Sequence, residues 1–186
     1  MMNDYKIWVD MDGVLTNWHK AACECFNVPY PTHSVLGRDW IVAQTGLNVS
    51  QLLSAMDAKK GFWEDMLPTP VMPRLVAYLD VNFPDWGILT SATHGSESWG
   101  GKAAWVRRYL RTTGLKRLVV CCGNKARFAA RNSVLIDDTP KITDKWIENG
   151  GMAFRWVEYT SDWQEAHDEQ FTELVQFLEP LKNTSK

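Results

Sequence analysis

The stretch Tyr5-Lys6-Ile7-Trp8-Val9-Asp10-Met11-Asp12-Gly13-Val14 joins a short apolar run to two acidic residues separated by one position. A short run that is nearly continuous in apolar residues is typical of a buried strand in a parallel sheet. Asp10 and Asp12 follow this run, and Gly13 allows the tight turn that would bring both acids to one point. We therefore predict a strand over residues 5–9 whose carboxyl end carries two carboxylates.

Four more apolar runs follow, separated by segments with helical patterns. The runs are Gly87–Leu89, Leu118–Cys121, Val134–Ile136 and Ala153–Val157, and the helical segments are Pro70–Val81, Lys102–Thr113, Pro140–Asn149 and Ser161–Glu179. We expect Gly114 to end the second of these helices, and Ser161 and Gln164 to form a capping box at the last. The alternation predicts an α/β fold with a doubly wound parallel sheet, in which ligands bind beyond the carboxyl ends of the strands.

The stretch between the first strand and Pro70 shows no strand pattern. Asn17–Phe26 and Val49–Lys59 have helical patterns, and glycines and prolines interrupt the rest. We therefore predict a small helical cap at residues 17–67, inserted after the first strand of an α/β core that comprises residues 1–16 and 68–186.

Composition excludes several classes of protein. The chain has 186 residues, of which 45% are hydrophobic and 23% charged, as in an ordinary globular protein and unlike a disordered chain, a collagen or a membrane bundle. Its net charge of −2 gives no reason to expect a stable complex with nucleic acid or an acidic membrane. The four cysteines, Cys23, Cys25, Cys121 and Cys122, lack the spacing of a zinc site. We expect no signal peptide and a cytoplasmic location.

Polar side chains follow four of the predicted strands. Asp10 and Asp12 follow the first strand, Thr90 and Ser91 the second, Lys125 the third, and Asp137 and Asp138 the fourth. The carboxyl ends of parallel strands meet at one edge of the sheet, so the carboxylates would repel one another unless a cation lay between them. Oxygen ligands without a nearby His or Cys favour Mg²⁺. With Mg²⁺ bound, the ion and the Lys125 ammonium would offer the positive charge that phosphoryl transfer requires.

Two acids of this edge have the chemistry of a phosphatase. Asp10 can attack phosphorus as a carboxylate nucleophile. Asp12 can protonate the leaving oxygen and later deprotonate the attacking water. Alternatively, acids at strand ends cap the helices that follow, and Asp137-Asp138 before Pro140 fits that interpretation by itself. The two acid pairs together with Thr90 and Lys125 favour catalysis.

These segments, Asp10-Met11-Asp12-Gly13-Val14, Thr90-Ser91, Lys125 and Asp137-Asp138, resemble the four ordered motifs of the haloacid dehalogenase-like (HAD) superfamily, in the form typical of its phosphatases. The resemblance covers about residues 5–157 and implies a Rossmann-like core. It implies that Asp10 is the nucleophile and Asp12 the general acid/base. Thr90, with Ser91 beside it, and Lys125 would bind phosphate. Mg²⁺ would be held by Asp10, the Asp12 backbone carbonyl and the Asp137-Asp138 pair.

Gly61-Phe62-Trp63, Leu67-Pro68 and Lys102-x-x-Trp105-Val106 are similar to segments of the 5′(3′)-deoxyribonucleotidase family. This second resemblance implies a cap whose aromatic residues stack on the base, and a role for Lys102 in holding the phosphate. Phe62 and Trp63 become base-contacting candidates, with Trp18 and Trp40 as weaker ones; alternatively, these rings pack the core of the cap. Many members carry an arginine where this chain has Gly123, and Arg127 or Arg131 is the candidate substitute.

We therefore expect a Mg²⁺-dependent phosphomonoesterase that forms an aspartyl-phosphate and acts on (deoxy)nucleoside monophosphates in deoxyribonucleotide catabolism. The alternatives are a phosphatase for sugar phosphates or nucleic-acid 3′-phosphate ends, and a non-catalytic scaffold that binds a nucleotide or a protein. The expected partner is a small phosphate ester, and the sequence is compatible with a homodimer.

Overall fold

One parallel sheet of five strands organises the fold, as the sequence predicts. The computed structural model describes residues 5–121 and 123–182, so Cys122 and both ends of the predicted core lie outside the described residues. The strands are β1 (Lys6–Val9), β2 (Gly87–Ser91), β3 (Leu118–Cys121), β4 (Ser133–Asp137) and β5 (Met152–Arg155). They are ordered β3-β2-β1-β4-β5, and every neighbouring pair is parallel.

Both faces of the sheet are covered because successive strand residues point to opposite sides. Ile7 and Val9 of β1 belong to the larger apolar cluster, which also contains residues of α5 (Met72–Asn82), α6 (Ser96–Lys116) and α8 (Gln164–Leu178). The intervening Trp8 contacts the smaller cluster, to which α7 (Pro140–Glu148) and the 3₁₀ turn η1 (Lys125–Phe128) contribute. This two-sided burial explains why the strands are almost uniformly apolar.

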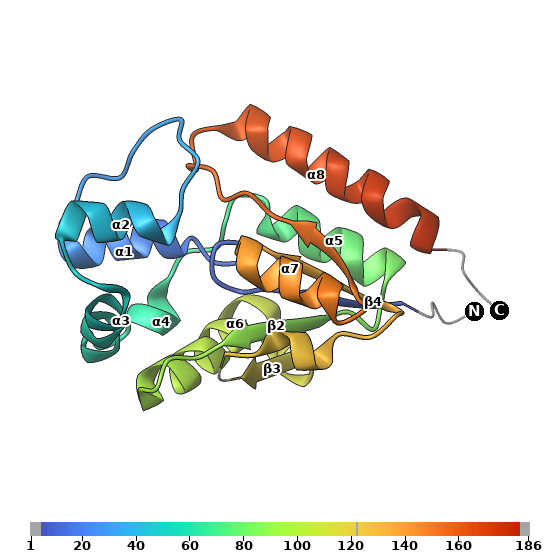
Figure 1. Ribbon diagram of the computed structural model, residues 1–186, viewed down its shortest axis with the longest axis horizontal. Helices are drawn as coiled ribbons and strands as arrows, with labels where there is room; N and C mark the ends of the chain where they lie inside the picture. The colour runs from blue at the N-terminus through green and yellow to red at the C-terminus, as the bar shows by residue number, and fades with distance from the viewer. Residues whose placement is uncertain (1–4, 122, 183–186) are drawn as a thin grey trace.

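Four helices of the 17–67 segment lie together at one end of the molecule, on the left in Figure 1. They are α1 (Trp18–Phe26), α2 (Arg38–Thr45), α3 (Val49–Ala58) and the single turn α4 (Phe62–Asp65). Asn17 caps α1, and Asn48 with Gln51 forms a capping box at α3. Every described strand of the sheet comes from outside this segment.

A main-chain hydrogen bond joins the two ends of the 17–67 segment, and others hold its middle to the core. Its two ends meet where the Asn17 N–H donates to the Leu67 carbonyl at 2.7 Å. Farther along, residues 34–36 lie antiparallel to residues 158–160: the Leu36 N–H donates to the Glu158 carbonyl at 2.7 Å, and the Thr160 N–H donates to that of Ser34 at 2.9 Å. The segment therefore leaves and re-enters the core at one point and touches it again beyond β5.

Two expected helix ends are wrong. Gly114 lies inside α6, which begins six residues before Lys102 and kinks at Arg111, where φ is 58°. The capping box at Ser161 does not form, because α8 starts at Gln164 with Trp163 in the N-cap position and no side-chain cap. None of the described helices is long and apolar enough to cross a membrane.

Gly101 sets the distance between α6 and α4. A Cβ at this position would lie 2.6 Å from the Trp63 Cβ and 3.2 Å from the Glu64 amide nitrogen. A Cβ at the adjacent Gly100 would meet no described atom within 4 Å, so the two glycines form a matched pair in one helix.

Alanine at these two glycines should therefore change stability in opposite directions. Gly100→Ala should raise the free energy of unfolding by about 0.5–1 kcal/mol, the ordinary gain within a helix. Gly101→Ala should lower it by about 1–3 kcal/mol, because α4 must move away. Urea denaturation of both variants measures the difference, and a gain for both would contradict the close packing of α4 on α6.

Candidate active site

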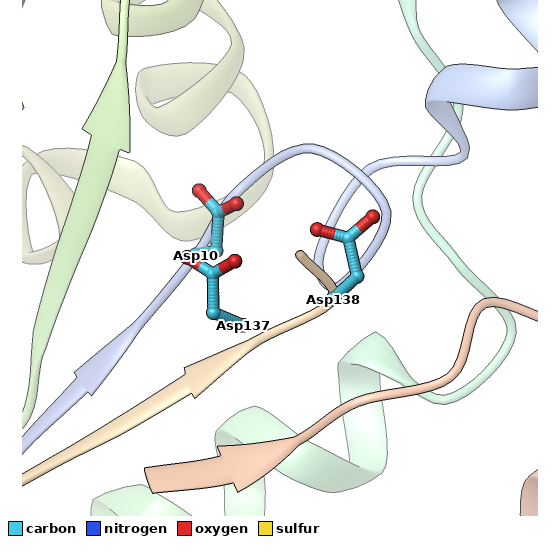
Figure 2. Close-up of side chains that lie close together, drawn as sticks. All are labelled: Asp10, Asp137 and Asp138. Carbon is cyan, nitrogen blue, oxygen red and sulfur yellow. The ribbon is translucent and has the colours of Figure 1, made fainter. Parts of the chain in front are cut away.

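Three carboxylates gather at the carboxyl ends of β1 and β4 (Figure 2). Asp10 directly follows β1, Asp137 is the last residue of β4, and Asp138 follows it. The Asp10 N–H donates to the Ile136 carbonyl at 2.8 Å, which carries the pairing of the two strands up to the acids. One oxygen from each carboxylate lies within 4.8 Å of the others. These three residues are therefore placed so that they could hold a metal ion.

A buried lysine ties two of these acids together. Lys125, in η1, is 2% exposed, and its Nζ lies 2.7 Å from Asp10 Oδ1 and 2.7 Å from Asp137 Oδ2. Burial lowers the pKa of Lys125, but the attraction of Asp10 and Asp137 outweighs it and raises the pKa above its ordinary value. Lys125 therefore stays charged. Asp10 Oδ1 also accepts the Met11 N–H at 2.6 Å, which fixes the orientation of the carboxylate.

The other two acids are hard to ionise without a cation. The pKa of Asp137 is raised to about 6, mainly because burial removes its hydration and secondly because Asp10 repels it. The charge of Lys125 opposes this shift. Burial also raises the pKa of Asp138 well above its usual range, and Asp10, Glu158 and Asp137 add to the effect. The cluster is thus an electrostatic liability in the metal-free protein.

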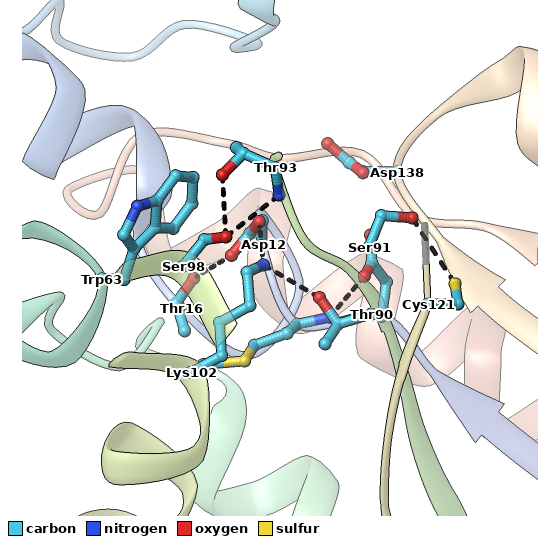
Figure 3. A network of polar contacts seen from close by, with 12 residues as sticks. Asp12, Thr16, Trp63, Thr90, Ser91, Thr93, Ser98, Lys102, Cys121 and Asp138 are labelled. Atoms are coloured by element: carbon cyan, nitrogen blue, oxygen red, sulfur yellow. Dashed lines mark hydrogen bonds and ion pairs between the residues drawn. The ribbon is translucent and has the colours of Figure 1, made fainter. Parts of the chain in front are cut away.

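Asp12 belongs to a separate polar group (Figure 3). Lys102 of α6 has no exposed surface, and its Nζ donates to Asp12 Oδ2 at 2.5 Å and to Thr90 Oγ1 at 2.9 Å. Burial raises the pKa of the Asp12 carboxyl, and Lys102 limits the rise. A carboxyl with a raised pKa and a fixed orientation is suited to proton transfer.

A fifth acid, Glu158, lies with Asp138 against the turn that follows β1. Gly13 has a φ of +79°, and a Cβ there would lie 2.7 Å from Asp138 Oδ2 and 2.9 Å from Glu158 Oε2. Only glycine fits this turn without strain or displacement. Glu158 is 4% exposed, and its Oε2 contacts Nδ1 of the buried His19 in α1. Burial lowers the pKa of His19, but Glu158 reverses the effect and raises it.

A cavity of about 530 Å³ opens above these residues. Its size lies in the range of about 300–1,000 Å³ that is typical of ligand pockets. The core contributes the polar floor, which includes Asp10, Asp12, Ser91, Lys125 and Asp138. The 17–67 segment contributes apolar and aromatic walls, which include Trp18, Val35, Leu36, Leu53 and Trp63.

The predicted phosphate-binding residues divide into two groups. Ser91 and Lys125 line the cavity. Thr90 and Lys102 do not; both are fully buried behind Asp12. In this structure Lys102 therefore serves as the partner of Asp12.

The four predicted base-contacting aromatics also divide. Trp63 and Trp18 are part of the cavity wall. Phe62 instead packs edge-on against Trp63, with ring centroids 4.9 Å apart, and Trp40 packs against the apolar core. Core packing alone therefore describes Phe62 and Trp40, whereas Trp18 and Trp63 belong to the core cluster and also line the cavity.

Several residues of the cavity wall carry no role in the sequence prediction, among them His19, Arg38, Arg155 and Glu158. Glu158 could have been found, because it directly follows the fifth predicted strand at the same edge of the sheet. Arg38 and Arg155 carry no motif that would have singled them out. Neither Arg127 nor Arg131, the candidate substitutes at Gly123, is among the described residues that line the cavity.

Comparison with known proteins adds the identity of the fold. No protein-family model and no curated protein matches the sequence. Among solved structures, a haloacid dehalogenase-like family hydrolase from Streptococcus pneumoniae is similar with a TM-score of 0.57 at 14% identity, covering 95% of this chain and 100% of that chain. A HAD family hydrolase from Deinococcus radiodurans R1, with bound phosphate and sodium, gives 0.57 at 12% identity, covering 98% and 100%. The chain therefore has the fold of the haloacid dehalogenase-like hydrolases.

Proposed function

We propose that the protein is a Mg²⁺-dependent phosphomonoesterase that uses Asp10 as a nucleophile. The observation that carries the proposal is the floor of the cavity, where Asp10, Asp138 and Lys125 lie together with Asp12 beside them. The structure from D. radiodurans with bound phosphate supports it as a protein of the same fold. Three acids at one point, two of them buried, also cost stability, which favours a role that uses them.

Asp10 and Asp12 divide the chemistry. Asp10 Oδ1 is engaged by the Met11 N–H and Lys125, so Oδ2 is the oxygen that attacks phosphorus. As the bond from phosphorus to Asp10 forms, the bond to the leaving oxygen breaks, and Asp12 gives that oxygen its proton. Asp12 then takes a proton from water, whose oxygen attacks phosphorus and releases Asp10 and inorganic phosphate. Lys102 and Thr16, which contact the two Asp12 oxygens, keep its carboxyl in place.

The acidic cluster fits a divalent cation by its chemistry. It offers oxygen ligands only, and the ionised forms of Asp137 and Asp138 lack sufficient positive charge around them. Asp10, Asp137 and Asp138 would hold Mg²⁺, together with the Asp12 backbone carbonyl that the HAD resemblance implies. When bound, the ion supplies positive charge to the acids and to the phosphate oxygens.

The walls of the cavity favour a substrate with a flat apolar part. We propose that residues 17–67 act as a cap and that Trp63 and Trp18 contact the base of a (deoxy)nucleoside monophosphate. Stacking on an aromatic ring is worth about 1–3 kcal/mol per base and tolerates different bases. The apolar residues Leu53, Val35 and Leu36 extend the same wall.

A panel of nucleoside monophosphates, sugar phosphates and a small aryl phosphate, assayed with Mg²⁺ and with a chelator, tests the reaction. We expect nucleotides to turn over best and every activity to stop on chelation. Asp10→Asn should lower kcat by at least about 10³-fold, because the amide is a poor nucleophile. Asp85→Asn is the control, since Asp85 is an exposed acid on the surface. Activity that survives chelation or Asp10→Asn would disprove the mechanism, whereas a preference for sugar phosphates would disprove only the substrate.

Trp63→Ala tests the contact with the base. Loss of a stacking ring should lower kcat/KM for nucleotides by about 10-fold or more relative to that for acetyl phosphate, which has no ring to stack. Steady-state kinetics with both substrates measure the ratio. An unchanged ratio would mean that the base does not contact this wall.

Asp138→Asn tests the electrostatic cost of the cluster. The neighbouring Asp137 shows the direction of the effect on stability. Its pKa is about 6 in the folded protein and about 3.9 in the unfolded chain, so the free energy of unfolding falls as the pH rises from about 3.9 to 6. Asp138 shifts in the same direction, so its charge destabilises the metal-free protein at pH 7.5.

Removing that charge should therefore raise Tm of the metal-free protein at pH 7.5, by about 2–4 °C for each 1 kcal/mol gained. The gain should shrink as the pH is lowered toward 4, and Mg²⁺ should stabilise the wild type more than the variant. Thermal unfolding with and without Mg²⁺ measures both effects, and Asp85→Asn again serves as the control. A lower Tm for metal-free Asp138→Asn at pH 7.5 would contradict the repulsion.

A further inference from the structure

We propose that Asp57 is a positioning residue that holds the aromatic wall of the cavity in register with the loop after β2. The inference rests on the proposed function, because it assigns a role in binding the nucleotide. Asp57 lies in the last turn of α3, within the 17–67 segment, and does not line the cavity itself. Its influence would reach the substrate through the two cavity residues that it contacts, Trp63 and Thr93.

Asp57 accepts hydrogen bonds from two different parts of the chain. Trp63 Nε1, in α4, donates to Asp57 Oδ1 at 2.8 Å. Thr93 Oγ1, two residues beyond β2, lies 2.8 Å from Oδ1 and 2.6 Å from Oδ2 of the same carboxylate. Among the described residues Asp57 forms no ion pair, so neutral donors satisfy its charge. One carboxylate thus joins the wall that would contact the base to the loop that follows Ser91.

The loop after β2 is shaped to receive this carboxylate. The Thr93 N–H donates to Ser98 Oγ at 3.0 Å, and Ser98 Oγ lies 2.7 Å from Thr93 Oγ1 (Figure 3). The Ser98 hydroxyl donates to the Gly95 carbonyl at 3.0 Å. A Cβ at Gly95 would lie 2.6 Å from Asp57 Oδ2, so any larger residue there would displace the acid. The Thr93–Ser98 turn therefore presents a donor and a matching space to a carboxylate from α3.

Trp63 depends on Asp57 for the direction of its indole ring. The ring is only 3% exposed, and Phe62 packs edge-on against it. Lys102 Nζ lies 5.1 Å from the ring centroid, within the range of a cation–π contact, while also bonding to Asp12. Among these contacts, the hydrogen bond from the indole N–H is the one that specifies the rotation of the ring. A turned ring would change the cavity wall and the environment of Lys102 together.

A double-mutant cycle between Asp57 and Trp63 tests the inference. The variants are Trp63→Phe, which keeps a ring but removes the N–H, Asp57→Ala, and the two combined, with thymidine 5′-monophosphate and acetyl phosphate as substrates. We expect each single variant to raise the ratio of KM for the nucleotide to KM for acetyl phosphate at least about fivefold. The value of kcat for the nucleotide should change less than its KM. The combined variant should be no worse than Asp57→Ala, because both changes break the same hydrogen bond.

Asp65→Ala is the matched control. Asp65 lies in α4, as Trp63 does, and its Oδ1 lies 2.9 Å from Arg108 Nη1 of α6. The side-chain bonds described for Asp65 do not involve Trp63. It should leave the ratio of the two KM values unchanged. If Asp57→Ala fails to fold, Thr93→Val takes its place in the cycle and should raise the same ratio, because Asp57 then loses the donor that fixes it to the core.

The outcomes distinguish failure of the positioning role from failure of the proposed function. Effects of Trp63→Phe and Asp57→Ala that multiply, KM values that rise equally for both substrates, or an equal effect of Asp65→Ala would overturn the positioning role alone. A wild-type protein that hydrolyses acetyl phosphate but no nucleotide would disprove the nucleotide substrate, and the positioning role with it. A wild-type protein that hydrolyses neither would disprove the proposed function itself.

Discussion

Repulsion among the carboxylates at the ends of β1 and β4 is the constraint on which the rest of the structure depends. Strand pairing brings Asp10, Asp137 and Asp138 to one point, where the first two are buried and Asp138 is partly buried at the floor of the cavity. Lys125 neutralises part of this charge, but the pKa values of Asp137 and Asp138 stay raised. Sites that keep such unfavourable charge are typically functional.

The second constraint is that the cavity has walls from two separate parts of the chain. Main-chain hydrogen bonds join the two ends of the 17–67 segment and hold residues 34–36 against residues 158–160 of the core, and the Asp57 carboxylate ties the segment to Thr93. The acidic floor comes from the core, whereas the aromatic lining comes from both parts, Trp156 from the core and Trp18 and Trp63 from the segment. The contact between α4 and α6 brings Trp63 beside Lys102.

Much of the core could be predicted because it follows from local rules. Apolar runs marked all five strands, and the rule that parallel strands end at one edge placed Asp10, Lys125, Asp137 and Asp138 near one another. The same rule, applied to the fifth strand, would have included Glu158. The fold class is confirmed, while the roles of these residues stay predictions.

The parts that the sequence did not predict depend on packing between distant elements. Gly100 and Gly101 favour a break in a helix, yet α6 passes through both, and the missing side chain at Gly101 lets α4 approach closely. Phe62 and Trp63 are adjacent in a single helical turn, and only the contacts with Asp57 and Lys102 determine which ring faces the cavity. Lys102 was expected at the phosphate, but its burial places it against Asp12.

The central claim is that Asp10, within this cluster, captures the phosphoryl group. Its most direct test is mass spectrometry of the protein after a reaction with substrate and Mg²⁺ is quenched in acid, which preserves an acyl phosphate. The account predicts one added phosphoryl group on the peptide that contains Asp10, absent from Asp10→Asn. Steady release of phosphate by a protein that never carries this group, or that carries it on another residue, would contradict the account.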